Sequence, residues 1–65
     1  MTPEHVREEV RLIERCKGDS EAAHCMEKAL WRSVLSSIAT GNAYAREVAA
    51  EALTTSAIDF DRWYA

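Results

Sequence analysis

The sequence predicts an all-α protein, a three-helix bundle with a short helical turn near its C-terminal end. Apolar residues recur at intervals of three and four, which is the spacing of one face of a helix. The two glycines and the single proline fall where helices would begin or end, and no segment alternates in the manner of a strand. We expect helices over residues 3–17, 20–40 and 43–54 and a helical turn over 59–64, within one domain that spans residues 1–65.

The first helix has sequence signals at both of its ends. Within Thr2–Glu4, threonine is a good helix cap, proline suits the first helical position, and glutamate complements the helix dipole. Gly18 follows as a typical C-terminal stop. The apolar face of this helix consists of Val6, Val10 and Ile13.

The second helix should begin with either Asp19 or Ser20 as its cap and end at Gly41. Its apolar positions are Ala23, Met26, Ala29, Leu30, Val34, Leu35 and Ile38, with Trp31 at the margin. This stripe is wider than the seam of a coiled coil. A wide stripe predicts that the helix contacts neighbours on two sides and is the central element of the bundle.

We expect Asn42 to cap the third helix, which is rich in alanine. Alanine favours the helix intrinsically, and its small side chain lets a neighbouring helix approach closely. The predicted inner face consists of Tyr44, Ala45, Val48, Ala49, Ala52 and Leu53. Thr54–Ser56 should then break the helix, because these residues are poor helix formers, and Asp59 can cap the final turn.

Three of the five aromatic residues lie within the last six positions. Such a short chain buries only about 60% of the surface that it exposes when unfolded. We therefore expect Ile58, Phe60 and Trp63 to fold back over the open end of the bundle, where each large side chain contributes roughly 1.5–3 kcal/mol. The alternative is that 62–64 forms an exposed anchor for a partner, since Arg, Trp and Tyr are enriched at binding hot spots.

Composition excludes several classes of protein. The net charge of −3, with basic and acidic residues interleaved, argues against a free-standing nucleic-acid binder. No run of eighteen apolar residues could span a membrane, and the N-terminal sequence lacks the apolar core of a signal peptide. We expect a cytoplasmic protein whose cysteines are thiols.

The residues that invite a catalytic or metal site have unsuitable spacing. Cys16, His24 and Cys25 are three candidate zinc ligands where a closed site needs four, and the two neighbours diverge on a helix. In a hairpin that turns near Gly18, the two cysteines are too far apart for a disulfide, so we expect both to be small buried hydrophobes. With no nucleophile–base pair and no phosphate loop, the sequence predicts neither an enzyme nor a bound cofactor.

A small helix-turn-helix regulator that binds DNA is the rival hypothesis, because Gly41 lies between two helices. Ser37 is acceptable at the small position before the glycine. Glu47, however, occupies a position that should be apolar and buried in this motif. The presumed recognition helix also carries one arginine and two glutamates, which would repel phosphates.

The segments EAAHCMEKALWRSVLSSIATG and AREVAAEALTTSAIDFDRWYA, within residues 21–65, resemble small all-helical accessory proteins of bacteriophages and bacterial mobile elements. The shared features are an acidic helix of the form AH…E…L…VL..IA.G and an ending of the form A..AL.T..IDF.RW.A. The resemblance implies a bacterial or phage-encoded cytoplasmic protein, with a host protein as target, and implies no catalytic residue.

The leading hypothesis is a non-enzymatic module that binds another protein or a second copy of itself as a homodimer. A long central helix cannot be covered fully by two shorter ones, so an apolar strip should remain for a partner. The residues expected to bind that partner are Met26, Trp31, Leu35, Arg62, Trp63 and Tyr64.

Overall fold

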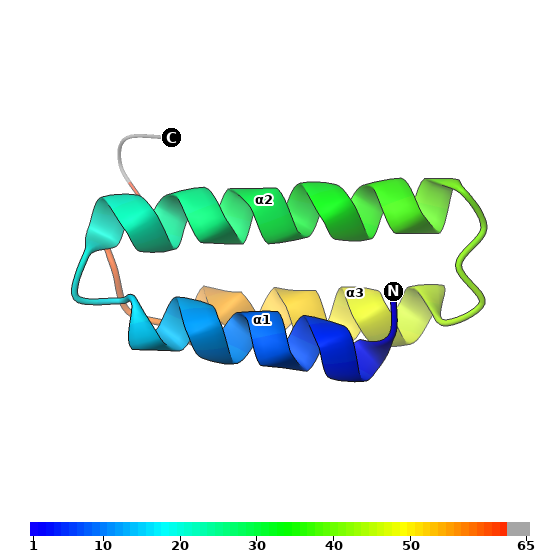
Figure 1. The fold of residues 1–65 in the computed structure, drawn as a ribbon, viewed down its shortest axis with the longest axis horizontal. Coiled ribbons are helices and arrows are strands. Elements are labelled where there is room, and N and C mark those ends of the chain that lie inside the picture. The colour runs from blue at the N-terminus through cyan, green and yellow to red at the C-terminus, as the bar shows by residue number, and fades with distance from the viewer. Residues whose placement is uncertain (63–65) are drawn as a thin grey trace.

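The computed structural model describes residues 1–62, and these form three α-helices and one short 3₁₀ helix (Figure 1). The elements are α1 (Pro3–Arg15), α2 (Ser20–Ala39), α3 (Ala45–Leu53) and η1 (Thr54–Ala57). No strand occurs in this part of the chain. The predicted all-α three-helix bundle is therefore confirmed.

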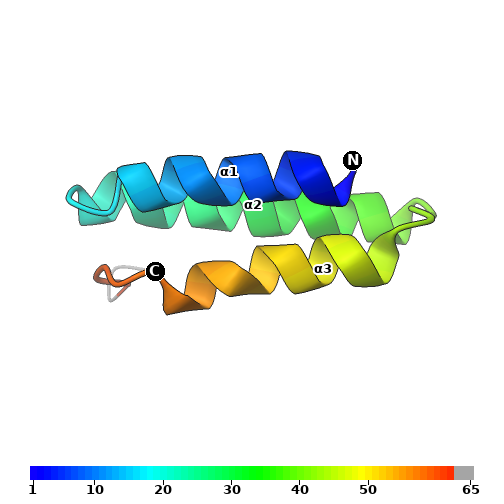
Figure 2. The same cartoon turned by 90° about the horizontal axis from the view of Figure 1, so that it is seen from below.

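The three helices form an elongated bundle in which each helix packs against the other two. Figures 1 and 2 show that α2 runs antiparallel to both α1 and α3, so that α1 and α3 run in the same direction side by side. An ion pair between Arg7 Nη2 and Glu51 Oε2 (2.8 Å) joins α1 to α3 at the surface. The longest helix therefore contacts neighbours on two sides, as its wide apolar stripe predicts, but it is no more central than α1 or α3.

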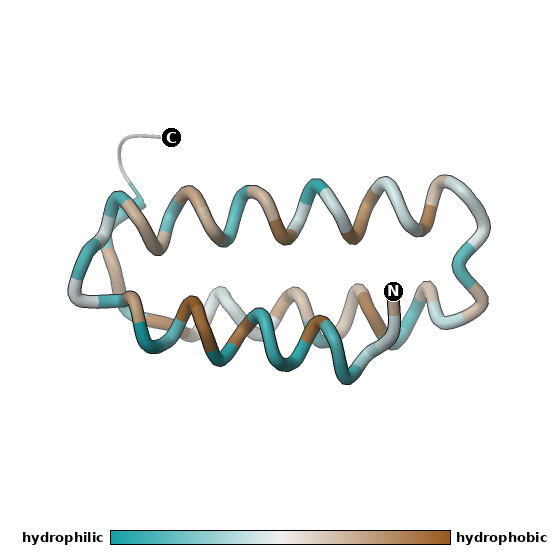
Figure 3. The backbone as a smooth tube through the Cα atoms, in the orientation of Figure 1, coloured by the Kyte–Doolittle hydropathy of each residue, from teal (hydrophilic) through white to brown (hydrophobic). Residues whose placement is uncertain are grey.

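The start of α1 follows its sequence signals. Thr2 Oγ1 accepts a hydrogen bond from the backbone N–H of His5 (3.2 Å), and Pro3 occupies the first turn. The helix ends at Arg15, two residues earlier than expected, and a turn leads into α2. Apolar and polar residues alternate along α1 in Figure 3, and its inward residues Val6 and Ile13 are fully buried.

Asp19, rather than Ser20, caps α2, because its carboxylate accepts a hydrogen bond from the backbone N–H of Ala22 (3.1 Å). At the other end, Gly41 has a φ of 94°. Glycine reaches this left-handed region without the steric cost that a Cβ would impose, so it can reverse the chain directly after the helix.

The predicted cap of α3 is wrong. The helix begins at Ala45, and its capping residue Tyr44 makes no side-chain cap. Asn42 instead forms a turn before the helix, where its Oδ1 accepts from the backbone N–H of Tyr44 (2.7 Å). The Asn42 amide also donates to Met1 O (2.9 Å) and to Ser37 Oγ (2.7 Å). The Asn42 side chain therefore links the N-terminus and the last turns of α2 to the loop between α2 and α3.

The inner face of α3 is narrower than predicted. Val48 is fully buried and Ala52 nearly so, whereas Tyr44 and Leu53 are 52% and 59% exposed. The placement of these two side chains in the core is therefore wrong. Because alanine lies on several sides of α3, the apolar pattern alone does not fix which side of the helix faces inward. The packing of Val48 decides it.

The short C-terminal helix is present, but it lies at Thr54–Ala57 and not over 59–64, since residues 59–62 are not helical. Thr55 is fully buried, and its hydroxyl donates to the backbone oxygen of Ala52 (3.0 Å). That bond satisfies a polar group that would otherwise favour a break in the helix, so the chain continues from α3 without interruption.

The segment after η1 closes the end of the bundle where α1 turns into α2 (Figure 1). Ile58 and Phe60 are buried within the same core as the helices. The backbone N–H of Asp61 donates to Ser20 Oγ (3.3 Å), which places the segment beside the first turn of α2. The prediction that Ile58 and Phe60 fold back over the core is confirmed, whereas Trp63 lies outside the described residues.

Candidate functional site

An apolar groove runs along α2 and, over part of its length, between α2 and α3. It consists of two adjoining hollows of about 450 Å³ and about 290 Å³, and Trp31 and Leu35 line both; within residues 1–62, the first is lined by α2 residues alone, and the second by residues of α2 and α3. The first hollow is completed by His24, Glu27, Lys28 and Arg32. The second is completed by Val34, Ile38, Ala49, Ala52 and Leu53. We call these two hollows together the α2–α3 groove.

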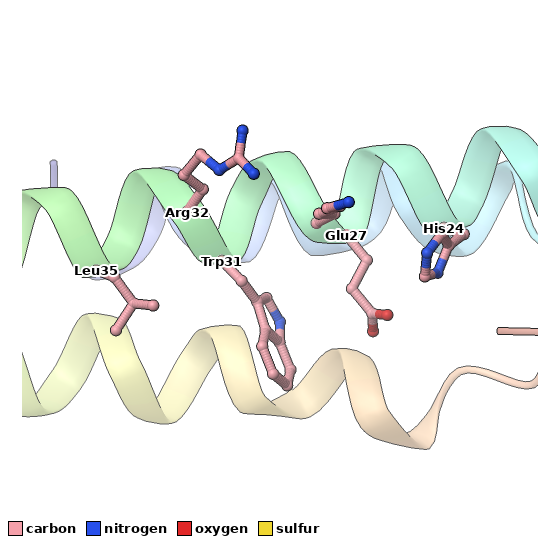
Figure 4. A pocket seen from close by; sticks show the side chains of 6 residues that line it. His24, Glu27, Trp31, Arg32 and Leu35 are labelled. Carbon is pink, nitrogen blue, oxygen red and sulfur yellow. The ribbon is translucent and has the colours of Figure 1, made fainter. Parts of the chain in front are cut away.

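The walls of the groove carry exposed aliphatic side chains. Leu35 on α2 is 66% exposed and Leu53 on α3 is 59% exposed, while Trp31 is 37% exposed. Figure 4 shows Trp31 and Leu35 extending from α2 toward α3. No residue of α1 lines either hollow, so the third helix covers the opposite side of this helix pair.

The indole ring of Trp31 lies between the two helices and forms the base of the groove. Its indole N–H donates to the backbone oxygen of Ala52 (3.2 Å) and to Thr55 Oγ1 (3.0 Å). Two partners on α3 and η1 hold the ring across the interhelical gap, and the remaining ring surface faces the groove. Removal of Trp31 would therefore loosen the packing of α2 on α3 as well as change the surface.

The rim of the groove is basic, although the protein as a whole is acidic. Lys28 and Arg32 line the first hollow, and Figure 4 shows Arg32 projecting from the side of α2 that faces away from α3. On α3, Arg46 lies three residues before Ala49 and seven before Leu53, which places all three on one face of the helix. None of the three basic residues makes an ion pair within residues 1–62.

One end of the groove is formed by an ion pair that sequence reasoning missed. Glu27 is only 7% exposed, and Arg62 binds it with two hydrogen bonds, Nε to Oε1 (2.9 Å) and Nη2 to Oε2 (3.1 Å). Two parallel hydrogen bonds of this kind fix the orientation of the guanidinium relative to the carboxylate, in addition to the attraction between the opposite charges. Glu27 could have been noticed because it interrupts the apolar stripe of α2, four residues after Ala23 and three before Leu30.

Arg62 also donates to backbone oxygens near its own segment. Nη2, which binds Glu27, is shared with the oxygens of Thr55 (2.9 Å) and Ile58 (3.1 Å), and Nη1 donates to Phe60 O (3.4 Å). Its guanidinium also lies over the Phe60 ring, 3.9 Å from the ring centre. These contacts give Arg62 the role of an internal anchor for the C-terminal segment, in place of the exposed partner contact that its sequence position suggested.

The environment of Glu27 favours its charged form. Burial alone would raise the pKa of this carboxyl group, but hydrogen bonding and the positive charge of Arg62 oppose it. Thr55 and His24 contribute in the same direction as Arg62. The pKa of Glu27 therefore lies below its ordinary value of 4.5.

Acidification should weaken the fold through Glu27. Because the pKa of this group is lower in the folded chain than in the unfolded chain, its contribution to stability is present in full above the ordinary value of 4.5 and is lost as the pH falls through the folded-state pKa. We expect the melting temperature of Glu27→Gln to fall less steeply than that of the wild type between about pH 6 and about pH 3. The control Glu47→Gln should keep the wild-type slope, and equal slopes for all three proteins would contradict this role of Glu27.

The residues expected to form one strip are divided between several places. Trp31 and Leu35 lie together in the α2–α3 groove. Met26 is half-buried against the core and lines a different hollow between α1 and α2, so its assignment to the same strip is wrong. Trp63 and Tyr64 lie outside the described residues. Leu53, which the sequence predicts to lie in the core, instead lines the groove.

Other candidate chemistry is not assembled by the fold. Cys16 is half-buried, but Cys25 is exposed, so the expectation that both are buried is wrong for Cys25; both are free thiols. Within residues 1–62, no three His, Cys, Asp or Glu side chains gather where they could hold a metal ion. In the same stretch, no helix is both long enough and apolar enough to traverse a lipid bilayer.

The link between α2 and α3 is a hairpin of antiparallel helices (Figure 2). A helix-turn-helix motif instead joins two helices that cross at a wide angle, near 90–120°. Glu47, which the motif would require to be buried, is exposed. The α2–α3 pair therefore presents a groove rather than a protruding recognition helix.

Comparison of the chain with protein-family models, curated protein sequences and solved structures gives no match. The resemblance of residues 21–65 to phage accessory proteins thus stays a prediction.

Proposed function

We propose that the chain is a non-enzymatic interaction module that binds a protein partner through the α2–α3 groove. The observation that carries this proposal is the exposure of Leu35 and Leu53 on opposite walls of an apolar groove that no described residue covers. Burying one such side chain contributes roughly 1.5–3 kcal/mol, so the two together would drive association. The groove offers apolar contact area and no set of residues arranged for acid–base or nucleophilic chemistry.

The shape of the groove suits an α-helix of the partner. Two antiparallel helices with apolar residues along their shared edge form the type of groove that accepts the apolar face of an amphipathic helix. A helix placed there would complete a four-helix arrangement around Trp31. The resemblance to phage accessory proteins supports a partner in the cytoplasm of a bacterial host.

Site-specific photo-crosslinking in the cell of origin tests this proposal. A photoreactive amino acid at Leu35 or at Leu53 should yield a crosslink to the same partner protein, because both positions face the groove. Leu12 is the matched control, since it is 38% exposed but lies on α1. Crosslinks to nucleic acid, or an equal yield of the same products from all three positions, would contradict the proposal.

A further inference from the structure

We infer that the occupant of the α2–α3 groove is an acidic amphipathic helix from a different protein. This inference rests on the proposed function and adds the chemistry of the partner. It follows from the charge around the groove and from the way in which the remaining charges of the chain are paired.

The rim residues supply the first part of the inference. Lys28 and Arg32 line the first hollow, and Arg46 shares a face of α3 with Ala49 and Leu53, which line the second. All three are positively charged and make no ion pair within residues 1–62. Glu27, the only acidic side chain among the described residues that line the groove, is already paired with Arg62. A helix that enters the groove therefore meets uncompensated positive charge, and carboxylates beside its apolar face would neutralise that charge.

A second copy of this chain would fit the groove poorly. In a two-fold symmetric dimer the same patch faces itself, so the basic rims would meet each other and repel. Nor can α1, the helix with the most acidic residues, enter the groove of another copy with its apolar face, because Val6 and Ile13 are buried in its own core. Two of the four carboxylates of α1 are also engaged, in the ion pairs Glu8–Arg11 and Glu14–Lys17.

The length of the groove sets the size of the partner segment. Its lining residues on α2 extend from His24 to Ile38, which corresponds to about 21 Å along the helix axis. A partner helix of about four turns spans this distance, with apolar anchors at positions i, i+3 or i+4, i+7 and i+11. Glutamate or aspartate beside these anchors would face the basic rim.

The inference is tested by titrating the full chain with two model peptides and observing its leucine methyl groups by NMR. The chain has four leucines, at positions 12, 30, 35 and 53, so the spectrum is simple to assign. The acidic peptide is an 18-residue helix, a length of about five turns, with leucine anchors and flanking glutamates. The second peptide is identical except that lysine replaces each glutamate.

We expect the acidic peptide to shift the methyl signals of Leu35 and Leu53 and to leave Leu12 unchanged. It should bind at least about tenfold more tightly than the basic peptide at low salt, and this difference should shrink as salt screens the rim charges. Equal affinity for the two peptides, tighter binding of the basic one, or no binding of either would overturn the inference.

Charge reversal supplies a matched pair of variants. The double variant Lys28→Glu and Arg32→Glu should weaken binding of the acidic peptide at least about tenfold and should strengthen binding of the basic peptide. The control Arg15→Glu replaces an exposed arginine on α1 that also makes no ion pair within residues 1–62, and it should change either affinity by less than about twofold. Far-ultraviolet circular dichroism verifies that all variants are folded.

Failure of this inference can be separated from failure of the proposed function. If Leu35 and Leu53 crosslink to a protein and charge reversal leaves that crosslink intact, the module function stands and the acidic helix is wrong. If sedimentation shows a dimer of the chain that Leu35→Glu dissociates, the occupant is a second copy. If the chain binds unrelated DNA in a salt-dependent manner and charge reversal abolishes that binding, the basic rim binds phosphates. This result would overturn both the proposed function and the acidic-helix inference.

Discussion

Replacing Arg62 by alanine is expected to lower the free energy of unfolding by about 2–3 kcal/mol. The substitution leaves the carboxylate of Glu27 buried without its partner, and breaking a buried ion pair in this way typically costs 3–5 kcal/mol. The lower figure applies here because the Arg62 side chain is 34% exposed and solvent screens part of the interaction. In a domain of this size the melting temperature should fall by about 10–20 °C, which thermal unfolding followed by circular dichroism would measure.

The controls for this prediction separate the ion pair from the loss of a side chain. Arg32→Ala removes an exposed arginine without an ion pair in residues 1–62 and should change stability by no more than about 0.5 kcal/mol. In a double-mutant cycle, Glu27→Leu with Arg62→Leu should be more stable than Arg62→Leu alone, since no unpaired charge remains. Additive effects of the two substitutions would show that the pair contributes nothing.

Replacing Phe60 by alanine should destabilise the chain by about 3 kcal/mol. Buried phenylalanine to alanine substitutions cost about 3–5 kcal/mol, and the position of Phe60 at the end of the bundle favours the lower part of that range. The substitution also removes the ring on which the Arg62 guanidinium lies. Because a domain of 65 residues has a total stability of only about 3–10 kcal/mol, this loss is a large fraction of the total, and urea unfolding should show a midpoint far below that of the wild type.

Leu35→Ala is the matched control for Phe60→Ala, because it removes a large apolar side chain that is exposed. Its effect on unfolding should stay within about 0.5 kcal/mol. Truncation after Ile58 removes Phe60 and Arg62 together and should abolish the cooperative thermal transition. A truncated chain that still unfolds cooperatively near the wild-type temperature would show that the C-terminal segment is not part of the core.

The fold was predictable because helices are specified by local signals. The Thr2 cap, the Gly41 stop and the three-to-four spacing of apolar residues act over a few positions, and each can be read directly from the sequence. The position of the short C-terminal helix was not predictable in this way. It depends on the burial of Thr55 and on the indole N–H of Trp31 that donates to its hydroxyl, and both arise only when α2 packs against the C-terminal part of the chain.

The site was less predictable because it depends on pairs that are distant in sequence. Glu27 and Arg62 are 35 residues apart, and neither residue type shows which opposite charge it will meet. The orientation of α3 about its axis, which exposes Leu53 and buries Val48, likewise results from packing. The exposure of Leu35 is predictable, because a long helix packed against two shorter ones must leave part of its apolar stripe uncovered.

The α2–α3 groove should be open in the free chain and covered when a partner binds. Solvent paramagnetic relaxation of the leucine methyl groups is the most direct test of both expectations. A soluble gadolinium chelate should strongly relax Leu35 and Leu53 in the free chain but not Leu30, which is 5% exposed. After addition of the partner identified by crosslinking, Leu35 and Leu53 should become protected while Leu12 remains accessible. Protection of Leu35 and Leu53 in the free chain, or their unchanged relaxation in the complex, would contradict a role for the groove in binding.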